Sequence, residues 1–432
     1  MVGKTIIGQK EKPKIAVVKK SGKKARFFAP ASIMIMGTFY NAFLAFMAAR
    51  GFPVNETVVS ITELLVVSMG AAYIFIHQKE LKKPLIHYAF FMATVVFCFI
   101  VMAANGIFLV KFIRDMLLIV LFILLGSLCK EEDLIKAFKI ISIMVLIGAL
   151  LEIRFTQRFI QLFEPALYYE KTRGMVAQGG YGLFGGAMAD ANRFSFGVFN
   201  IPRLCSLFLE QVSLANFSMV LAIFTASFWS RLVKRDRILF LFTIILIILG
   251  NNTRTGSTFV VLMLAGFWVF PMLPDKVQVL VMPLVILFAR MFIFDPYSKP
   301  EHWGDDLEGR VGLTMSFLSN LDIQSYLIGN MRAVSQSQDS GYVYLVCFST
   351  IFGAIIYWLY TSLVVPGIDK QNKRFTYGSS LFIAINLMIG AAIFTIKVSA
   401  PLWLVGGFLY QRACLMREQK RKTYVSAIPK KS

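Results

Sequence analysis

The sequence predicts an all-α polytopic membrane protein with about twelve transmembrane helices. Of its 432 residues, 57% are hydrophobic and only 16% are charged, whereas soluble domains are about a quarter charged. The mean hydropathy is +0.67. Many apolar runs approach the ~20 residues that a spanning helix needs. Composition and run length together therefore favour a membrane protein over a soluble protein with a large core.

The apolar runs place the expected spans along the chain. They lie at 28–50, 57–77, 84–105, 107–129, 136–153, 204–230, 237–250, 256–273, 276–294, 341–365, 377–396 and 398–414. The fourth run is imperfect, because Lys111, Arg114 and Asp115 lie in it. Charges inside a membrane often mark an ion pathway, but a neutralised pair within the bundle is the favoured interpretation here.

Basic clusters beside the apolar runs predict the orientation, because cytoplasmic loops carry an excess of Lys and Arg. With the N-terminal tail inside, the junctions "HQKELKKP", "CKEEDLIK", "SRLVKRDR", "PDK" and "DKQNKR" and the C-terminal tail fall on one side. We therefore expect two basic cytoplasmic tails, 1–27 and 415–432, around a transmembrane domain at 28–414. The net charge of +21 then reflects topology and attraction to membrane lipid, and nucleic acid is not an expected partner.

Two long segments, 154–203 and 295–340, fall on the opposite side, which is the periplasm in a bacterium. The first contains "QGGYGLFGGAMADANRF", which is too irregular for a spanning helix and is expected to form a loop with short or re-entrant pieces. The second begins with the acidic stretch "DPYSKPEHWGDDLEG". Loops longer than about 15 residues are usually functional or disordered.

Three arginines fall on this outer side: Arg203, Arg254 and Arg310. Each alone has a simple explanation, because an arginine at a helix end commonly snorkels or binds a carbonyl. Together they run against the positive-inside bias. The planar guanidinium suits phosphate oxygens, so the three arginines are candidate ligands for a phosphate group.

Two carboxylates are candidate catalytic residues on the same side. Glu210 follows Arg203 by seven residues, which places both on one face if the segment is a continuous helix. An ion-pair partner and a general base are equally good interpretations of Glu210. Asp339 opens "DSGYVYLVCF" at the start of the tenth span, where an Asp or Ser also serves as a helix cap.

Several chemistries have no signature in the sequence. It contains no P-loop, no GxGxxG followed by an α/β unit, no HExxH and no GxSxG. The three histidines are scattered and the five cysteines show no paired spacing. We therefore expect no metal, no cofactor and no disulfide.

Four stretches resemble the superfamily of O-antigen ligases and Wzy-type polymerases. "RLCSLFLEQVSLANF" is similar to its R-x-x-G-x-F-x-(E/N)-P-N signature, and "GNNTRTGSTFVVLMLAG" to its helix start with "S-R-(T/G)". "EGRVGLTMSFLSNLDIQSYLIGN" and "DSGYVYLVCFSTIFGAIIYWLY" resemble two later segments, so order and spacing agree over about residues 200–360. The chain departs from the pattern at Cys205–Ser206, where a glycine is common, and at Gln211–Val212, where "PN" is common.

The resemblance implies a glycosyltransferase of the bacterial inner membrane that works at the periplasmic face without a metal or nucleotide sugar. Its donor and acceptor would be glycans linked to undecaprenyl diphosphate, and a chain-length regulator is a further implied partner. Arg203 and Arg310 match the essential loop arginines that are proposed to hold the donor diphosphate. Arg254 matches the "SRT" arginine, and Asp339 stands where ligases carry a histidine.

The aspartate favours a polymerase of repeat units in exopolysaccharide, capsule or O-antigen synthesis. In such an enzyme Glu210 is the first candidate for the base and Asp339 the second. A ligase that transfers glycan to a lipid acceptor is one alternative. A transporter or flippase for a lipid-linked or anionic substrate is another, although the inverted repeats typical of transporters are not visible.

Overall fold

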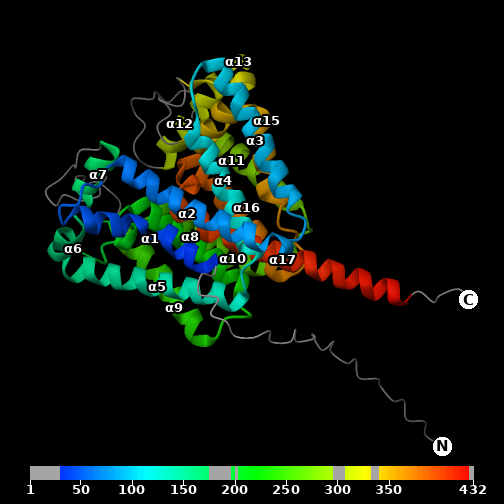
Figure 1. The fold of residues 1–432 in the computed structure, drawn as a ribbon, viewed down its shortest axis with the longest axis horizontal. Helices are drawn as coiled ribbons and strands as arrows, with labels where there is room; N and C mark the ends of the chain where they lie inside the picture. Colours follow the sequence, from blue (N-terminus) through cyan, green and yellow to red (C-terminus); the bar gives the residue numbers. More distant parts are fainter. Residues whose placement is uncertain (1–29, 175–195, 200–202, 295–306, 332–339, 428–432) are drawn as a thin grey trace, which may run out of the picture.

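The computed structural model describes residues 30–174, 196–199, 203–294, 307–331 and 340–427. Within these ranges the chain forms helices joined by turns and contains no strand, which confirms the all-α class. The helices pack side by side into one bundle, and α17 extends beyond it (Figure 1).

A helix lies on each of the twelve apolar runs. These are α1 Pro30–Ala48, α2 Glu56–His77, α3 Leu85–Asn105, α4 Val110–Ser127, α5 Glu131–Arg154, α8 Gln211–Phe228, α9 Lys234–Asn251, α10 Arg254–Val269, α11 Val281–Phe288, α15 Gly341–Leu363, α16 Lys370–Ile389 and α17 Ile396–Ala427. Seven helices in the described part of the chain are long and apolar enough to cross a membrane (α1, α2, α3, α5, α8, α10 and α15). A count of twelve spans remains a prediction.

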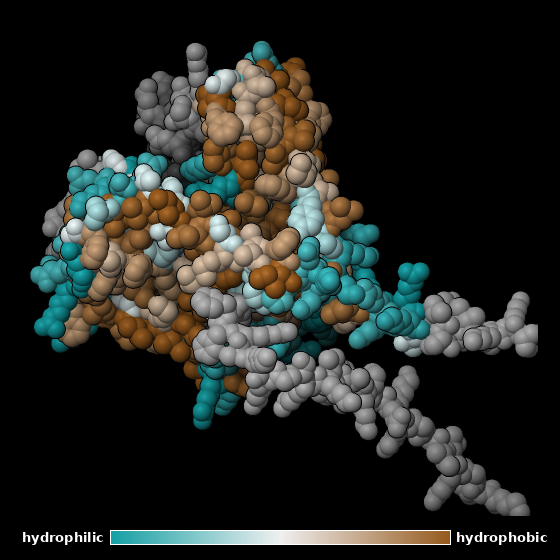
Figure 2. Space-filling model, in the orientation of Figure 1, coloured by the Kyte–Doolittle hydropathy of each residue, from teal (hydrophilic) through white to brown (hydrophobic). Residues whose placement is uncertain are grey.

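Large apolar side chains cover much of the outer surface of the bundle (Figure 2). Phe75, Ile76, Leu85 and Phe108 are each more than 70% exposed. Soluble monomers rarely expose apolar patches of more than a few hundred Å². The surface and the long apolar helices together indicate a membrane-embedded protein.

The centre of the bundle is the pair α4 and α17, whose backbones approach closely at two glycines. A Cβ atom at Gly126 would collide with the carbonyl oxygen of Leu404, and one at Gly407 with that of Ile123. Ser127 Oγ also lies 3.2 Å from the Gly407 oxygen, to which it donates. Small residues allow this approach, which adds van der Waals contact where lipid offers no hydrophobic drive.

The helix connections contact one another in two sets. Contacts within the set that was expected inside join Lys82 with Glu418 (3.2 Å), Arg231 with Glu131 (3.7 Å), Gly367 with Asp275 (3.0 Å), and Arg412 with Asp369. Contacts within the other set join Arg50 with Leu162 (3.4 Å) and Asn105 with Ile328 (3.0 Å). This arrangement agrees with alternating helices, although which set faces the cytoplasm remains a prediction.

Short helices form the described parts of the two long outer segments. The first segment contains α6 Thr156–Phe163 and α7 Pro165–Arg173, and the second contains α12 Leu307–Asn320 and α13 Ile323–Ile328. The expected short pieces are therefore present. The stretch "QGGYGLFGGAMADANRF", residues 178–194, lies almost wholly outside the described residues.

Three helix ends differ from the expectations. The span expected at 204–230 begins only at Gln211, and the run at 276–294 is divided into a 3₁₀ turn at Val277–Leu280, α11, and a π-helical turn at Ala289–Ile293. The residues after 414 are not a separate tail, because α17 continues to Ala427. Met, Arg, Glu, Gln and Lys in this stretch are good helix formers. A helix of 32 residues is about 48 Å long, which exceeds the bilayer core.

Candidate functional site

The segment between Arg203 and Glu210 is not a continuous helix, so the expected pairing of these two residues on one helix face is wrong. Ser206–Phe208 forms a 3₁₀ turn, Leu209 adopts a left-handed conformation (φ 56°), and Glu210 is the extended residue that precedes α8. The carboxylate of Glu152 accepts backbone N–H groups from Cys205 (3.1 Å) and Ser206 (2.6 Å). These bonds satisfy donors that would otherwise join a helix.

Glu152 is a positioning residue that the sequence interpretation missed. It lies at the end of α5, and its side chain is buried at 2% exposure. A carboxylate in an apolar run is costly and needs partners. This glutamate in "GALLEIRF" was therefore a usable signal, and its partners turn out to be the backbone of the segment that carries Arg203.

Asn251, the last residue of α9, joins this segment to two helices. Its amide nitrogen donates to the carbonyl oxygens of Leu204 (2.6 Å) and Gln211 (2.9 Å). The backbone oxygen of Asn251 accepts from Nε of Arg203 at 2.8 Å. Arg254 begins α10 only three residues later and is exposed. The structure therefore brings the segments of Arg203 and Arg254 together, as expected, at the start of α8.

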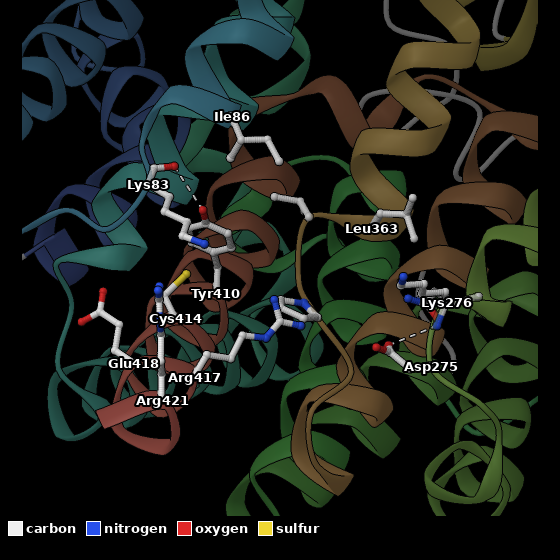
Figure 3. A pocket seen from close by; sticks show the side chains of 13 residues that line it. Lys83, Ile86, Asp275, Lys276, Leu363, Tyr410, Cys414, Arg417, Glu418 and Arg421 are labelled. Atoms are coloured by element: carbon white, nitrogen blue, oxygen red, sulfur yellow. Dashed lines mark hydrogen bonds between the residues drawn. The ribbon is translucent and has the colours of Figure 1, made fainter. Parts of the chain in front are cut away.

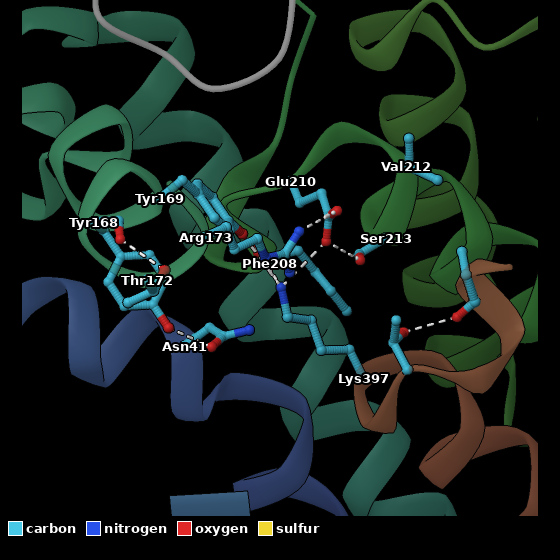
Figure 4. Close-up of polar contacts among 12 residues, drawn as sticks. Asn41, Tyr168, Tyr169, Thr172, Arg173, Phe208, Glu210, Val212, Ser213 and Lys397 are labelled. Atoms are coloured by element: carbon cyan, nitrogen blue, oxygen red, sulfur yellow. Dashed lines mark hydrogen bonds and ion pairs between the residues drawn. The ribbon is translucent and has the colours of Figure 1, made fainter. Parts of the chain in front are cut away.

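Glu210 lies beside this junction and is held by two cations from distant parts of the chain (Figure 4). Its Oε1 is 3.2 Å from Nη1 of Arg173, which ends α7. Its Oε2 is 3.4 Å from Nζ of Lys397, which lies at the start of α17. Ser213 donates to Oε2 at 2.7 Å. The partner of Glu210 is thus an Arg–Lys pair and not Arg203.

The two cations keep Glu210 ionised. Burial opposes ionisation, but the charges of Lys397 and Arg173 and the bond from Ser213 outweigh it and lower the pKa of Glu210 to about 2. Such a carboxylate is a weak proton acceptor at neutral pH. The geometry therefore supports the ion-pair interpretation of Glu210 over the general base.

Arg173 and Lys397 were not among the candidate residues. Lys397 is only 2% exposed, and its ammonium also donates to Phe208 O (3.1 Å) and Tyr169 Oη (3.4 Å). Burial raises the pKa of Tyr169 well above its usual range, so its hydroxyl is a neutral partner. A single lysine between two apolar runs was the available signal for Lys397. Arg173 lies in an unremarkable polar stretch and gave none.

Arg310 is held at a different point, on the connection between α16 and α17. Its Nη1 donates to Ile389 O at 2.8 Å, and Thr314 on the same helix donates to Met388 O at 2.8 Å. Thr314 also bonds Ser340 (2.9 Å), which caps α15. Asp339 itself lies outside the described residues. The chain after Ile389 leads within eight residues to Lys397, so Arg310 is attached to the strand of chain that positions this lysine.

The charges of the fourth span form a neutralised cluster, which confirms the favoured interpretation. Arg114 lies 2.8 Å from Asp115 and 2.6 Å from Glu63 of α2. Asp115 also accepts from the hydroxyl of Tyr344 at 2.7 Å. These partners satisfy the charges within the bundle.

In comparisons with known proteins, no family model, no curated protein and no solved structure matches the chain. Among the described residues, no group of three or more His, Cys, Asp or Glu side chains is placed to hold a metal ion. Function must therefore be inferred from the arginines, the carboxylates and the helices that place them.

Proposed function

We propose that this protein is a glycosyltransferase of the bacterial inner membrane that polymerises repeat units linked to undecaprenyl diphosphate. The reaction would occur at the periplasmic face and serve exopolysaccharide, capsule or O-antigen synthesis. The proposal combines the resemblance of four sequence stretches with the arrangement of cationic side chains around the start of α8.

One observation carries the proposal: Arg203 and Arg254 gather where the ends of α8, α9 and α10 meet. Arg203 is held through Asn251, and Arg254 follows on the next helix. Glu152, buried below, gives this segment its shape through three bonds to Cys205 and Ser206. Guanidinium groups positioned in this way suit a diphosphate.

The reaction needs stabilisation of a leaving group. A sugar hydroxyl of the acceptor attacks the anomeric carbon of the donor, the bond from this carbon to the diphosphate oxygen breaks, and undecaprenyl diphosphate leaves. Negative charge develops on the diphosphate, so cations held in place before the reaction lower the barrier. Arg203, Arg254 and Arg310 take this role in the proposal.

The acceptor hydroxyl must also lose its proton, and a carboxylate suits this step. Glu210 is ionised but is held between Arg173 and Lys397. This makes it a positioning residue that fixes α7 and α17 beside α8. Asp339 then becomes the leading candidate for the base, on the sequence resemblance alone.

Reconstitution tests the proposal. The full chain is placed in liposomes with lipid-linked repeat units extracted from cells that lack the protein, and products are separated on a gel. Wild type is expected to produce a ladder of polymer. Arg203→Ala and Arg310→Ala are each expected to lower polymer formation at least 100-fold, because each removes a cation from the developing charge.

Arg158→Ala is the matched control, because Arg158 is exposed on α6, on the same side of the molecule. It is expected to keep wild-type activity, and insertion of every variant is checked in the liposome pellet. Normal ladders from both cluster variants would reject the proposal. Transfer to a different lipid acceptor without a ladder would indicate a ligase, and movement of the lipid-linked substrate without a new bond would indicate a flippase.

A further inference from the structure

A cavity of about 570 Å³ lies at the opposite end of the bundle from the arginine cluster. It is bounded by the start of α3, the turn before α11, the end of α15 and the second half of α17 (Figure 3). Cys414 in its wall follows Lys397 by seventeen residues of the same helix, which corresponds to about 25 Å. The cavity is therefore separate from the proposed glycosyl-transfer site.

Four cationic side chains line the cavity: Lys83, Lys276, Arg417 and Arg421. All four are exposed, and no hydrogen bond or salt bridge of these side chains is recorded within the described ranges. They come from three separate parts of the chain, and Figure 3 shows Lys276 across the cavity from Lys83 and Arg417. Cations that converge from different elements make a positive site.

The two acids of the lining do not neutralise it. Asp275 accepts the backbone N–H groups of Lys276 (3.1 Å) and Gly367 (3.0 Å). Glu418 pairs with Lys82, 3.2 Å away, which is not a lining residue. Both carboxylates are engaged with other groups, so the cavity keeps a positive excess.

The remaining wall is apolar and continues onto the surface that faces lipid. Ile86, Leu363 and Val364 line the cavity together with Tyr410. Ile86 is 49% and Leu363 is 40% exposed, and both lie at the ends of helices that are apolar enough to cross a membrane. A ligand that fits this wall has an anionic head and an apolar body.

We infer that this cavity binds the headgroup of an anionic phospholipid, with its phosphate among Lys83, Lys276, Arg417 and Arg421. The glycerol and upper acyl chains lie against Ile86 and Leu363. Basic pockets between transmembrane helices on the cytoplasmic side commonly bind such headgroups, and the basic junctions predict that this end of the bundle is cytoplasmic. The bound lipid ties α17 to α3 and α15.

Native mass spectrometry of the detergent-purified full chain tests the inference. The protein is titrated with phosphatidylglycerol, with phosphatidylcholine, and with inorganic phosphate. Wild type is expected to retain one phosphatidylglycerol at least tenfold more tightly than phosphatidylcholine. Arg417→Gln/Arg421→Gln is expected to weaken this binding about 30-fold, because each basic residue near the surface contributes about fivefold.

Lys420→Gln/Lys422→Gln is the matched control. These two lysines are exposed on the same helix, carry the same charge, and do not line the cavity. The control is expected to change the affinity less than threefold. Equal losses in the two double variants would show a general effect of charge and would overturn the site.

Ile86→Trp tests the cavity without a change in charge, because the larger side chain fills the space. It is expected to reduce phosphatidylglycerol binding at least tenfold, while gel filtration still gives a single peak. Unchanged binding in this variant would overturn the location. Inorganic phosphate that competes at the same concentration as the lipid would show that the site takes a soluble anion, which would overturn the assignment to a lipid.

Discussion

At the scale of single residues, Glu210 changes its meaning once its neighbours are known. In the sequence it follows Arg203 at helical spacing, which suggests a pair within one helix. In the structure its carboxylate joins Arg173 and Lys397. Three charges at 2% to 40% exposure are tolerated because each has a partner of opposite sign.

Loss of one partner should leave an uncompensated charge. Glu210→Gln and Lys397→Met are each expected to lower the melting temperature by roughly 5 °C or more, because breaking a buried pair costs about 3–5 kcal/mol. The double variant Glu210→Gln/Lys397→Met removes both charges and is expected to recover part of the loss. The check is thermal unfolding in detergent, and additive losses would contradict the pairing.

Acid should weaken the same contact. The pKa of Glu210 is lowered to about 2, below the ordinary value of about 4.3 for a glutamate. Its contribution to stability is therefore present above pH 4.3 and is lost as the pH falls toward 2. The difference in melting temperature between wild type and Glu210→Gln is expected to shrink between pH 5 and pH 3.

Glu170→Gln is the control for this pH series, because Glu170 is an exposed glutamate on α7. The difference between wild type and this variant should stay the same over the pH range. A constant difference for Glu210→Gln as well would show that protonation of Glu210 does not govern the contact.

At the scale of elements, the close pair of α4 and α17 determines where Lys397 stands. The two glycines at this contact allow backbone to meet backbone. Neighbouring Gly406 differs, since a Cβ there would meet only the ring of Phe375 at 3.3 Å and other side-chain atoms. Consecutive glycines of one helix therefore have different roles.

Alanine scanning distinguishes these two glycines. Gly407→Ala is expected to destabilise the bundle by about 1–3 kcal/mol, because the helices must move apart. Gly406→Ala is expected to cost less than 1 kcal/mol, because a side chain can shift more easily than a backbone. Unfolding midpoints in detergent provide the measurement, and equal midpoints for the two variants would contradict the close helix contact.

At the scale of the whole molecule, the two sets of helix connections predict an orientation. With the basic set inside, Lys79 and Arg235 face the cytoplasm and Glu56 faces the outside. Each of these positions is exposed, and the five native cysteines are buried. Single cysteines at the three positions therefore report on the two faces.

A membrane-impermeant maleimide applied to intact cells is expected to label Glu56→Cys. Lys79→Cys and Arg235→Cys are expected to react only after the membrane is permeabilised. Wild type is the control for reaction of the native cysteines. Labelling of Lys79→Cys in intact cells would invert the orientation and move the arginine cluster to the cytoplasmic side.

Hydropathy and charge by themselves determined the all-α class, the positions of the helices, the basic junctions and the gathering of Arg203 with Arg254. These features depend on local composition and on order along the chain, so they are readable without coordinates. Helix ends were less accurate. The start of α8 at Gln211 depends on Glu152, a residue 53 positions from Cys205, and no local pattern carries that information.

Only the tertiary structure decided which charges meet. The partners of Glu210 lie 37 and 187 residues away, and the cations of the lipid cavity come from α17, the turn before α3 and the turn before α11. Such meetings depend on how helices pack, and packing depends on backbone approach at residues such as Gly407. A sequence read locally shows where polar groups are costly, while the fold determines which partners offset that cost.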